Sequence, residues 1–186
     1  MFCLKNGLVQ VYTGNSKGKT TAALGLAMRA LGHGFSVAFV QFLKGGNYYG
    51  EFKIAKKFPK LKFVQFGVGC TKTEIKGCHE CKECFEKNLK NKQTAIKGLE
   101  EAYGMAISGK YDLLVLDEIN FAVSSDLLSV EQVINLIKNK HPKTELILTG
   151  RNAPKEFIEF AQLVTEMREI KHPMKIGLVG REGIDY

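Results

Sequence analysis

A glycine, lysine and threonine run near the N-terminus has the composition of a phosphate-binding loop. It reads GNSKGKTT over residues 14–21, after an apolar, β-branched run at 8–11 and before a helical pattern that starts at Ala22. Strand, glycine-bearing turn and helix in this order form the context in which such loops bind phosphate. The N–H groups and dipole of the helix start attract an anion, and glycine lets the backbone close around it. The predicted phosphate site comprises Gly14, Asn15, Ser16, Lys17, Gly18, Lys19, Thr20 and Thr21.

Two side chains of this loop have specific predicted roles. Lys19 would reach the outer phosphates of a nucleotide, and the Thr20 hydroxyl would complete the coordination shell of a Mg²⁺ ion. The common pattern has a glycine where Thr13 stands, and here that glycine has moved to Gly14. The alternative is a glycine-rich helix cap that binds nothing, but the position between a strand and a helix favours the phosphate loop.

A pair of carboxylates gives the second indication of a nucleotide site. The buried-strand pattern of residues 113–116 ends in Asp117 and Glu118. In P-loop proteins an acid at this place holds Mg²⁺, and ligands of open parallel sheets gather at the carboxyl ends of the strands. Thr20, Asp117 and Glu118 are therefore the predicted magnesium ligands. The alternative is a buried strand that merely ends in an acid.

Arg151 is a third candidate at the same edge of the sheet. It follows the predicted strand 144–148, in the loop Thr149-Gly150-Arg151-Asn152. An arginine can hold phosphate through two parallel hydrogen bonds. An arginine at a strand end can equally form a surface ion pair, and the spacing leaves both readings open.

Apolar periodicity predicts strands that alternate with helices, and hence an α/β fold with a mainly parallel sheet. The 186 residues suit one domain, 1–186, with an irregular cysteine-rich insertion at 67–85. In the predicted helix 85–108, the residues Leu89, Ile96, Leu99, Tyr103 and Ile107 share one face. Further helices are predicted at 20–31, 50–58, 129–139 and 154–161, and strands at 36–43, 61–66, 111–116, 144–148, 163–167 and 176–179.

Charge and hydropathy exclude several classes of protein. The formal charge is +8, but the lysines are spread along the chain, which favours a solvated surface over a nucleic-acid surface. No run of 18 apolar residues exists, and the first strand begins too early for a signal peptide, so we expect a cytoplasmic protein without a membrane partner. His33, His141 and His172 lie in turns and loops, where structural roles are expected.

The chain as a whole resembles the P-loop type of ATP:corrinoid adenosyltransferase, the cob(I)alamin adenosyltransferase of cobalamin synthesis and salvage. The resemblance spans nearly all of the sequence and keeps its order. The blocks that carry it are TGNSKGKTTAALGLAMRALGHG, VAFVQFLKG, YDLLVLDEIN, LTGRNAP, VTEM, KHP and the closing GIDY.

This resemblance implies a RecA-like P-loop fold, a homodimer, and transfer of the 5′-deoxyadenosyl group of ATP to the Co(I) of a reduced corrinoid. The loop 14–20 would hold the departing triphosphate, with Lys19 and Glu118 as catalytic residues and Mg²⁺ at the carboxylates. An electron donor would reduce Co(II). Because Co(I) is itself a strong nucleophile, no catalytic triad is needed, and none is evident. Two alternatives stay open: a P-loop ATPase or small-molecule kinase that acts at the γ-phosphate, with Glu118 orienting a water, and a non-catalytic nucleotide-dependent corrinoid carrier.

The chain departs from the family pattern at three places. Ser16 stands where a second glycine is usual, which fits if its φ is negative. The N-terminal extension of many members is missing. Gly69-Cys70-Thr71-Lys72 replaces a Gly-Phe-Thr-Trp stretch whose aromatics face the corrinoid in some members.

A cysteine cluster lies in the same region. Cys78, Cys81 and Cys84 are spaced like metal ligands, which suggests a zinc or iron–sulfur site. The fourth ligand would come from Cys70, His79 or a partner subunit. The alternative is a set of reduced surface thiols, because disulfides are rare in cytosolic proteins.

Overall fold

A single six-stranded parallel sheet forms the centre of the molecule. The computed structural model describes residues 4–46, 49–68, 87–178 and 180–186. The strand order is β3-β2-β4-β5-β1-β6, and all neighbouring strands are parallel. The predicted α/β architecture is therefore confirmed. The strands are β1 (Val9–Thr13), β2 (Val37–Phe42), β3 (Leu61–Phe66), β4 (Leu113–Asp117), β5 (Glu145–Thr149) and β6 (Leu163–Glu166).

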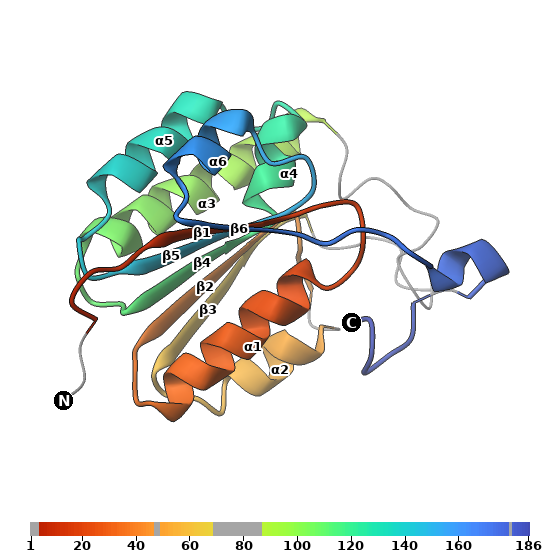
Figure 1. Cartoon of the computed structure of the whole chain (residues 1–186), viewed down its shortest axis with the longest axis horizontal. Coiled ribbons are helices and arrows are strands. Elements are labelled where there is room, and N and C mark those ends of the chain that lie inside the picture. Colours follow the sequence, from red (N-terminus) through yellow and green to blue (C-terminus); the bar gives the residue numbers. More distant parts are fainter. Residues whose placement is uncertain (1–3, 47–48, 69–86, 179) are drawn as a thin grey trace.

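Helices cover both faces of this sheet. In Figure 1, α1 and α2 lie on one face, and α3, α4, α5 and α6 lie on the other. The segment that follows β6 extends away from the sheet. Among the described residues, no helix has the length and apolarity that crossing a membrane would require. The helices are α1 (Lys19–Gly32), α2 (Gly50–Ala55), α3 (Leu89–Ile107), α4 (Ile119–Ser124), α5 (Val130–Asn139), α6 (Lys155–Phe160) and the short 3₁₀ helix η2 (Pro173–Ile176).

The neighbouring interior strands β2 and β4 are buried over their whole length. Helices cover both of their faces, which explains why their sequences VAFVQF and LLVLD are almost continuously apolar instead of alternating. One hydrophobic core lies under α3, α4, α5 and α6, and the other lies under α1. The polar residues that do occur in these strands, Gln41 and Asp117, are therefore buried as well.

Helix α3 packs closely on the sheet because its inner face consists mainly of small residues. A Cβ atom on Gly98 would lie 2.8 Å from Cγ of Phe66 and 3.0 Å from Cε1 of Phe42. The predicted face of this helix is wrong at its ends, since Leu89 is 80% exposed and Ile107 is 47% exposed. The helix also begins at Leu89 rather than at residue 85, and Asn88 caps it by accepting a hydrogen bond from the Asn91 N–H at 2.8 Å. The buried face of α3 is made mainly of small side chains. A prediction based on the spacing of large apolar residues therefore misplaces this face at the ends of the helix.

Two other elements differ from the sequence prediction. The predicted strand 176–179 does not form, because Ile176 ends the 3₁₀ helix η2 and Gly177 has a φ of 77°. Pro173 starts this helix, and the His172 side chain caps it. Helix α4 was not predicted, because it follows β4 after the single residue Glu118, and no turn sequence separates the two elements.

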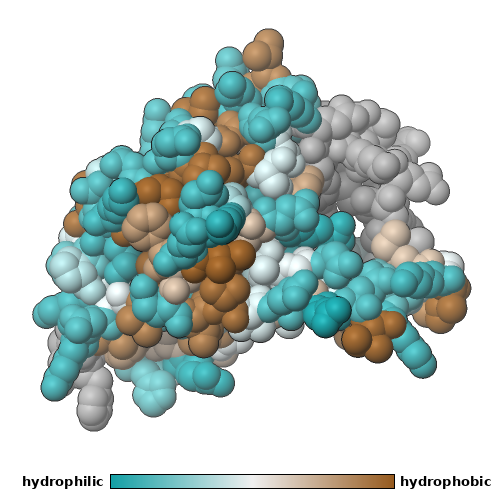
Figure 2. All heavy atoms as spheres, turned by 45° about the horizontal axis from the view of Figure 1, so that its top comes forward, coloured by the Kyte–Doolittle hydropathy of each residue, from teal (hydrophilic) through white to brown (hydrophobic). Residues whose placement is uncertain are grey.

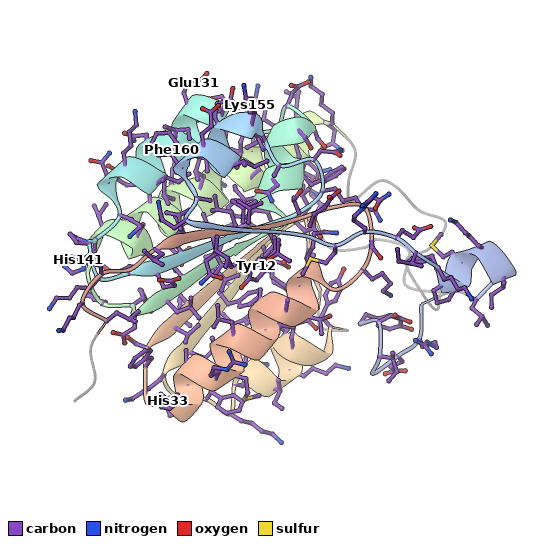
Figure 3. All side chains as sticks on the ribbon, in the orientation of Figure 1. Tyr12, His33, Glu131, His141, Lys155 and Phe160 are labelled. Atoms are coloured by element: carbon purple, nitrogen blue, oxygen red, sulfur yellow. The ribbon has the colours of Figure 1, made fainter. Side chains whose placement is uncertain are left out.

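The outer face of the α3–α6 layer mixes charged and apolar side chains. Figure 2 shows apolar surface between hydrophilic groups on this face. Phe160 of α6 is one of the exposed apolar residues, and the ammonium of Lys138 lies 5.4 Å from its ring centroid. Figure 3 shows Phe160 on this outer layer together with Glu131 and Lys155.

The packing of α3 gives a test of the fold. We expect Gly98→Ala to lower the free energy of unfolding by about 1–2 kcal/mol, since overpacking a filled core has a cost of this order. Gly104→Ala on the same helix is the matched control, because no atom lies within 4 Å of the added Cβ. It should stabilise the protein by about 0.5–1 kcal/mol through helix propensity. Urea unfolding measures both variants, and equal effects would contradict this account of α3.

Candidate nucleotide and metal site

The loop between β1 and α1 has the backbone of an anion-binding turn. Gly14 and Gly18 have φ values of 102° and 112°, a region that favours glycine. A Cβ atom on Gly14 would lie 2.3 Å from the backbone oxygen of Met167, so only glycine fits there. Thr13 is still paired with Glu166 in the sheet. The turn therefore starts one residue later than in the common pattern, which explains why the first glycine stands at position 14.

Ser16 fits this loop without strain. The described non-glycine residues with positive φ are Leu43, Glu118, Asp126 and Asn152. Ser16 is not among them, so its φ is not positive, and serine can stand where the family usually has glycine. Its N–H donates a hydrogen bond to the backbone oxygen of Met167 at 3.1 Å.

Lys19 is fixed across the loop. Its ammonium donates hydrogen bonds to the backbone oxygens of Gly14 at 2.8 Å and Ser16 at 2.6 Å, and the residue is only 6% exposed. Burial lowers the pKa of Lys19. The Ala22 N–H makes the first helical hydrogen bond, to Gly18 at 2.8 Å, so the N–H groups just before it face no helical carbonyl. A positive charge and free N–H groups thus converge where a phosphate would bind.

Asp117 lies at the centre of the site. It is fully buried at the end of β4, which β5 separates from β1. Its Oδ1 accepts hydrogen bonds from the hydroxyls of Thr20 at 2.9 Å and Thr149 at 2.7 Å. Its Oδ2 accepts from Lys44 Nζ at 2.8 Å and Gln41 Nε2 at 3.2 Å. Burial alone would raise the pKa of Asp117, but the charge of Lys44 and these hydrogen bonds outweigh burial and lower it.

This arrangement fits a magnesium ion. The Thr20 hydroxyl and an oxygen of Asp117 lie 2.9 Å apart and offer the hard oxygen donors that Mg²⁺ prefers. A cationic group already contacts both residues, because Lys44 Nζ lies 2.8 Å from Asp117 Oδ2 and 3.2 Å from Thr20 Oγ1. No cluster of three or more histidine, cysteine or acidic residues occurs in the part of the chain that the structure describes.

Glu118 forms the sharp corner between β4 and α4. Its φ is 65°, and its N–H donates to the Thr149 hydroxyl at 3.1 Å. Burial and the neighbouring Asp117 raise the pKa of Glu118. A left-handed non-glycine residue at such a corner costs energy and is typical of functional sites. The structure places Glu118 next to Asp117, another of the predicted metal ligands. The roles of Glu118 in metal binding and catalysis stay predictions.

Arg151 is exposed in the loop after β5. Within the described ranges it makes no hydrogen bond or ion pair, so the surface ion pair weighed above is not found there. Its charge contributes to the lowered pKa of Lys19, after burial. Arg151 is therefore close to the loop and available for an anion.

Three predicted loop residues point elsewhere. Lys17 forms an exposed ion pair with Asp185, and the hydrogen bond from Lys17 is the main cause of the lowered pKa of Asp185. Asn15 Oδ1 accepts a hydrogen bond from the Glu169 N–H at 3.4 Å. Both residues thus hold the C-terminal segment against the loop. The side chain of Thr21 is exposed.

A polar cavity of about 510 Å³ opens beside the phosphate loop. Its volume lies within the range of small-molecule sites. A ligand whose phosphates bind the loop could therefore place a further part of the molecule in this cavity. Its lining includes Asn15, Asn152, Glu166, Arg168 and Glu169.

Sequence reasoning missed Gln41, Lys44 and Thr149 as members of the site. Two of them could have been found, because Lys44 and Thr149 each directly follow a predicted strand, at the edge of the sheet where ligands gather. Gln41 is a polar residue within an otherwise apolar buried strand, which is a weaker signal.

The remaining predicted sites lie outside this cluster. Cys78, Cys81, Cys84 and the stretch 69–72 fall outside the described residues. Figure 3 shows His33 and His141 at the end of the molecule opposite the phosphate loop. The structural roles expected for these two histidines agree with that position.

Comparison with known proteins identifies the family to which these features belong. Residues 5–186 match the family described as ATP:corrinoid adenosyltransferase BtuR/CobO/CobP. The chain belongs to this family. The phosphate loop, the acid pair and the loop of Arg151 all lie within the part that matches the adenosyltransferase family.

Individual adenosyltransferases agree over almost the full length. A corrinoid adenosyltransferase from a Sinorhizobium species is 34% identical over 98% of this chain and 81% of its own length. The corrinoid adenosyltransferases of Escherichia coli K12 and Salmonella typhimurium are 32% and 33% identical, over 98% of this chain and 87% of theirs. The flagellar accessory protein FlaH from Methanocaldococcus jannaschii shares the fold, with a TM-score of 0.53 and 12% identity over 88% of this chain and 72% of its own.

The Thr149 hydroxyl lies between the Asp117 carboxylate and the Glu118 N–H, which gives a test of the site. Thr149→Val keeps the shape but removes the hydroxyl that binds Asp117 and the Glu118 N–H. We expect the affinity for MgATP to fall about tenfold, since a hydrogen bond to a charged group contributes about 1.5 kcal/mol or more. Isothermal titration calorimetry measures this affinity.

The matched control is Thr144→Val. Thr144 is also fully buried, and its hydroxyl donates to the Tyr111 backbone oxygen at 2.8 Å, before β5 begins. Both variants should lose some stability, but only Thr149→Val should lose affinity. Equal affinities in the two variants would show that Thr149 does not organise the site.

Proposed function

We propose that this protein transfers the 5′-deoxyadenosyl group of ATP to the Co(I) of a reduced corrinoid and releases triphosphate. The observation that carries the proposal is the match to the ATP:corrinoid adenosyltransferase family over residues 5–186. The geometry of the phosphate loop supports it, because Lys19 and the start of α1 lie where a triphosphate would bind.

The reaction needs no base or nucleophile from the protein. Co(I) donates an electron pair to C5′ of ATP, a cobalt–carbon bond forms, and the bond from C5′ to the phosphate oxygen breaks. Triphosphate leaves with the electrons of that bond. The protein has to orient ATP and stabilise the departing charge.

Three groups would stabilise the departing triphosphate. The Lys19 ammonium and the N–H groups at the start of α1 face the phosphate loop, and Arg151 is available from the loop after β5, the strand next to β1. When bound, Mg²⁺ would neutralise phosphate charge, held by Thr20 and Asp117 with Glu118 beside them. Burial lowers the pKa of Lys19. The negative charge of a bound phosphate would act in the opposite direction and favour the charged form of this lysine.

Other partners follow from this function. An electron donor has to reduce Co(II) before the transfer, and we expect the protein to act in the cytoplasm. We also expect a homodimer. Exposed apolar side chains on α6 and the edge strand β6 (Ile158, Phe160, Leu163 and Val164) are consistent with a subunit contact. A zinc or iron–sulfur site at Cys78, Cys81 and Cys84 stays a prediction.

The alternative function is a P-loop ATPase or small-molecule kinase that acts at the γ-phosphate. The observation that favours it is Glu118, which lies beside the predicted metal ligands and could orient a water. The identity of the phosphate product separates the two functions: the transferase releases triphosphate, and the ATPase or kinase releases ADP.

An anaerobic assay with ATP, Mg²⁺ and chemically reduced cobalamin tests the proposal. The wild type should produce the absorbance change of a cobalt–carbon bond together with triphosphate. Lys19→Ala should lower the rate about 10²–10³-fold, the usual loss when one stabilising donor is removed. Lys110→Ala, which removes an exposed lysine before β4, is the control and should keep the wild-type rate. Release of ADP without any change in the corrinoid would contradict the proposed function.

A further inference from the structure

The chain turns sharply after β2 and directs Lys44 toward the site. Leu43 has a φ of 61°, although it is a bulky residue, and it is almost fully buried. Its N–H donates to the Phe66 backbone oxygen at 2.9 Å, which fixes the turn against β3. A left-handed non-glycine residue costs about 1–3 kcal/mol, so the surrounding contacts have to hold it in place. The position of Lys44 is therefore determined by the fold.

Lys44 makes its polar contacts with two of the three predicted metal ligands, Asp117 and Thr20. Its Nζ lies 2.8 Å from Asp117 Oδ2 and 3.2 Å from Thr20 Oγ1, and its side chain is only 12% exposed. The ring of Tyr49 lies 5.7 Å from the same ammonium. The contact with Asp117 is an ion pair, so the group beside Asp117 and Thr20 is a cation.

An ammonium and a magnesium ion would compete for Asp117 and Thr20. Mg²⁺ binds oxygen at about 2.1 Å and tolerates little distortion of its shell. Nζ at 2.8 Å from Asp117 would leave two like charges on one carboxylate in a nearly dry site. Lys44 and a metal ion held by Thr20 and Asp117 would therefore repel each other.

We propose that Lys44 is a tethered cation that occupies the magnesium position until the nucleotide arrives. This inference rests on the magnesium site of the proposed function. With Lys44 in place, the buried charge of Asp117 is compensated and the site is closed to free divalent ions. The metal ion enters together with ATP, because the phosphates offer the displaced ammonium a new partner.

The side chain of Lys44 is suited to such an exchange. Its four-carbon stem lets the ammonium move while the turn at Leu43 stays fixed. Lys19 is different, because its ammonium contacts the backbone oxygens of the phosphate loop and does not contact Asp117 or Thr20. The two lysines therefore have separate roles: Lys19 binds phosphate, and Lys44 controls the metal position.

Binding of Mn²⁺ alone, followed by the loss of its free-ion EPR signal, tests this inference without any assay of activity. The wild type should bind Mn²⁺ weakly without nucleotide. Lys44→Met should bind it at least tenfold more tightly, because Asp117 then lacks its cation. Lys44→Gln, which keeps a hydrogen-bond donor but no charge, should gain affinity in the same way and provides a second variant if Lys44→Met folds poorly.

Lys140→Met is the matched control. Lys140 is a half-buried lysine whose ammonium donates to the backbone oxygens of Gly7 at 2.7 Å and Thr144 at 2.9 Å, before β1 and β5 begin. This variant loses the same charge, but it should bind Mn²⁺ as weakly as the wild type. A tighter binding in Lys140→Met as well would indicate a general effect of net charge and would overturn the inference.

A second arm with ATP separates this inference from the proposed function. Because ATP itself binds Mn²⁺, this arm measures protein-bound Mn²⁺ by equilibrium dialysis against a protein-free solution of Mn²⁺ and ATP. If the wild type retains no Mn²⁺ with ATP, the proposed metal site itself is wrong. If it binds Mn²⁺ with ATP, but neither Lys44 variant gains affinity without nucleotide, only the role of Lys44 is overturned. Equal affinity of the wild type for Mn²⁺ with and without ATP would also overturn that role, whatever the variants do.

Discussion

The buried charge of Asp117 is the constraint on which the rest of the site depends. A carboxylate that is removed from water is stable only when donors and an opposite charge surround it. Here Thr20 comes from α1, Gln41 from β2, Lys44 from the following turn and Thr149 from β5. Three parts of the chain that are distant in the sequence, at residues 20, 41–44 and 149, therefore have to converge at the end of β4. The same convergence brings the phosphate loop and the acid together.

Further hydrogen bonds extend this network through the edge of the sheet. Gln41 accepts a hydrogen bond from Gln65 of β3 at 2.9 Å, and Thr149 accepts one from the N–H of Glu118 at 3.1 Å. Asn120 of α4 donates to the backbone oxygen of Gly150 at 3.2 Å. Side-chain hydrogen bonds thus link four of the six strands, β2, β3, β4 and β5, around one buried carboxylate. Such a network holds the groups proposed to contact ATP in fixed positions, which the proposed transfer requires because the protein supplies orientation and charge.

The sequence predicted the local parts of this site and missed those that depend on neighbours in space. Lys19 and Asp117 belong to patterns that are read along one strand and its following turn, and their placement at one edge follows from parallel strands. Thr149 meets Asp117 only because β5 lies between β1 and β4, an order that no local pattern specifies. The buried face of α3 depends on Gly98, whose small size matters only against the aromatic ring of Phe66.

The most direct test of the central role of Asp117 is the affinity for ATP with and without Mg²⁺, in the wild type and in Asp117→Asn. Circular dichroism would first establish that the variant is folded. The account predicts that Mg²⁺ strengthens ATP binding to the wild type and has almost no effect on the variant. ATP without metal should still bind to the variant, because Lys19 and the phosphate loop are intact. An unchanged effect of Mg²⁺ in Asp117→Asn would show that the metal ion binds elsewhere and would contradict the account.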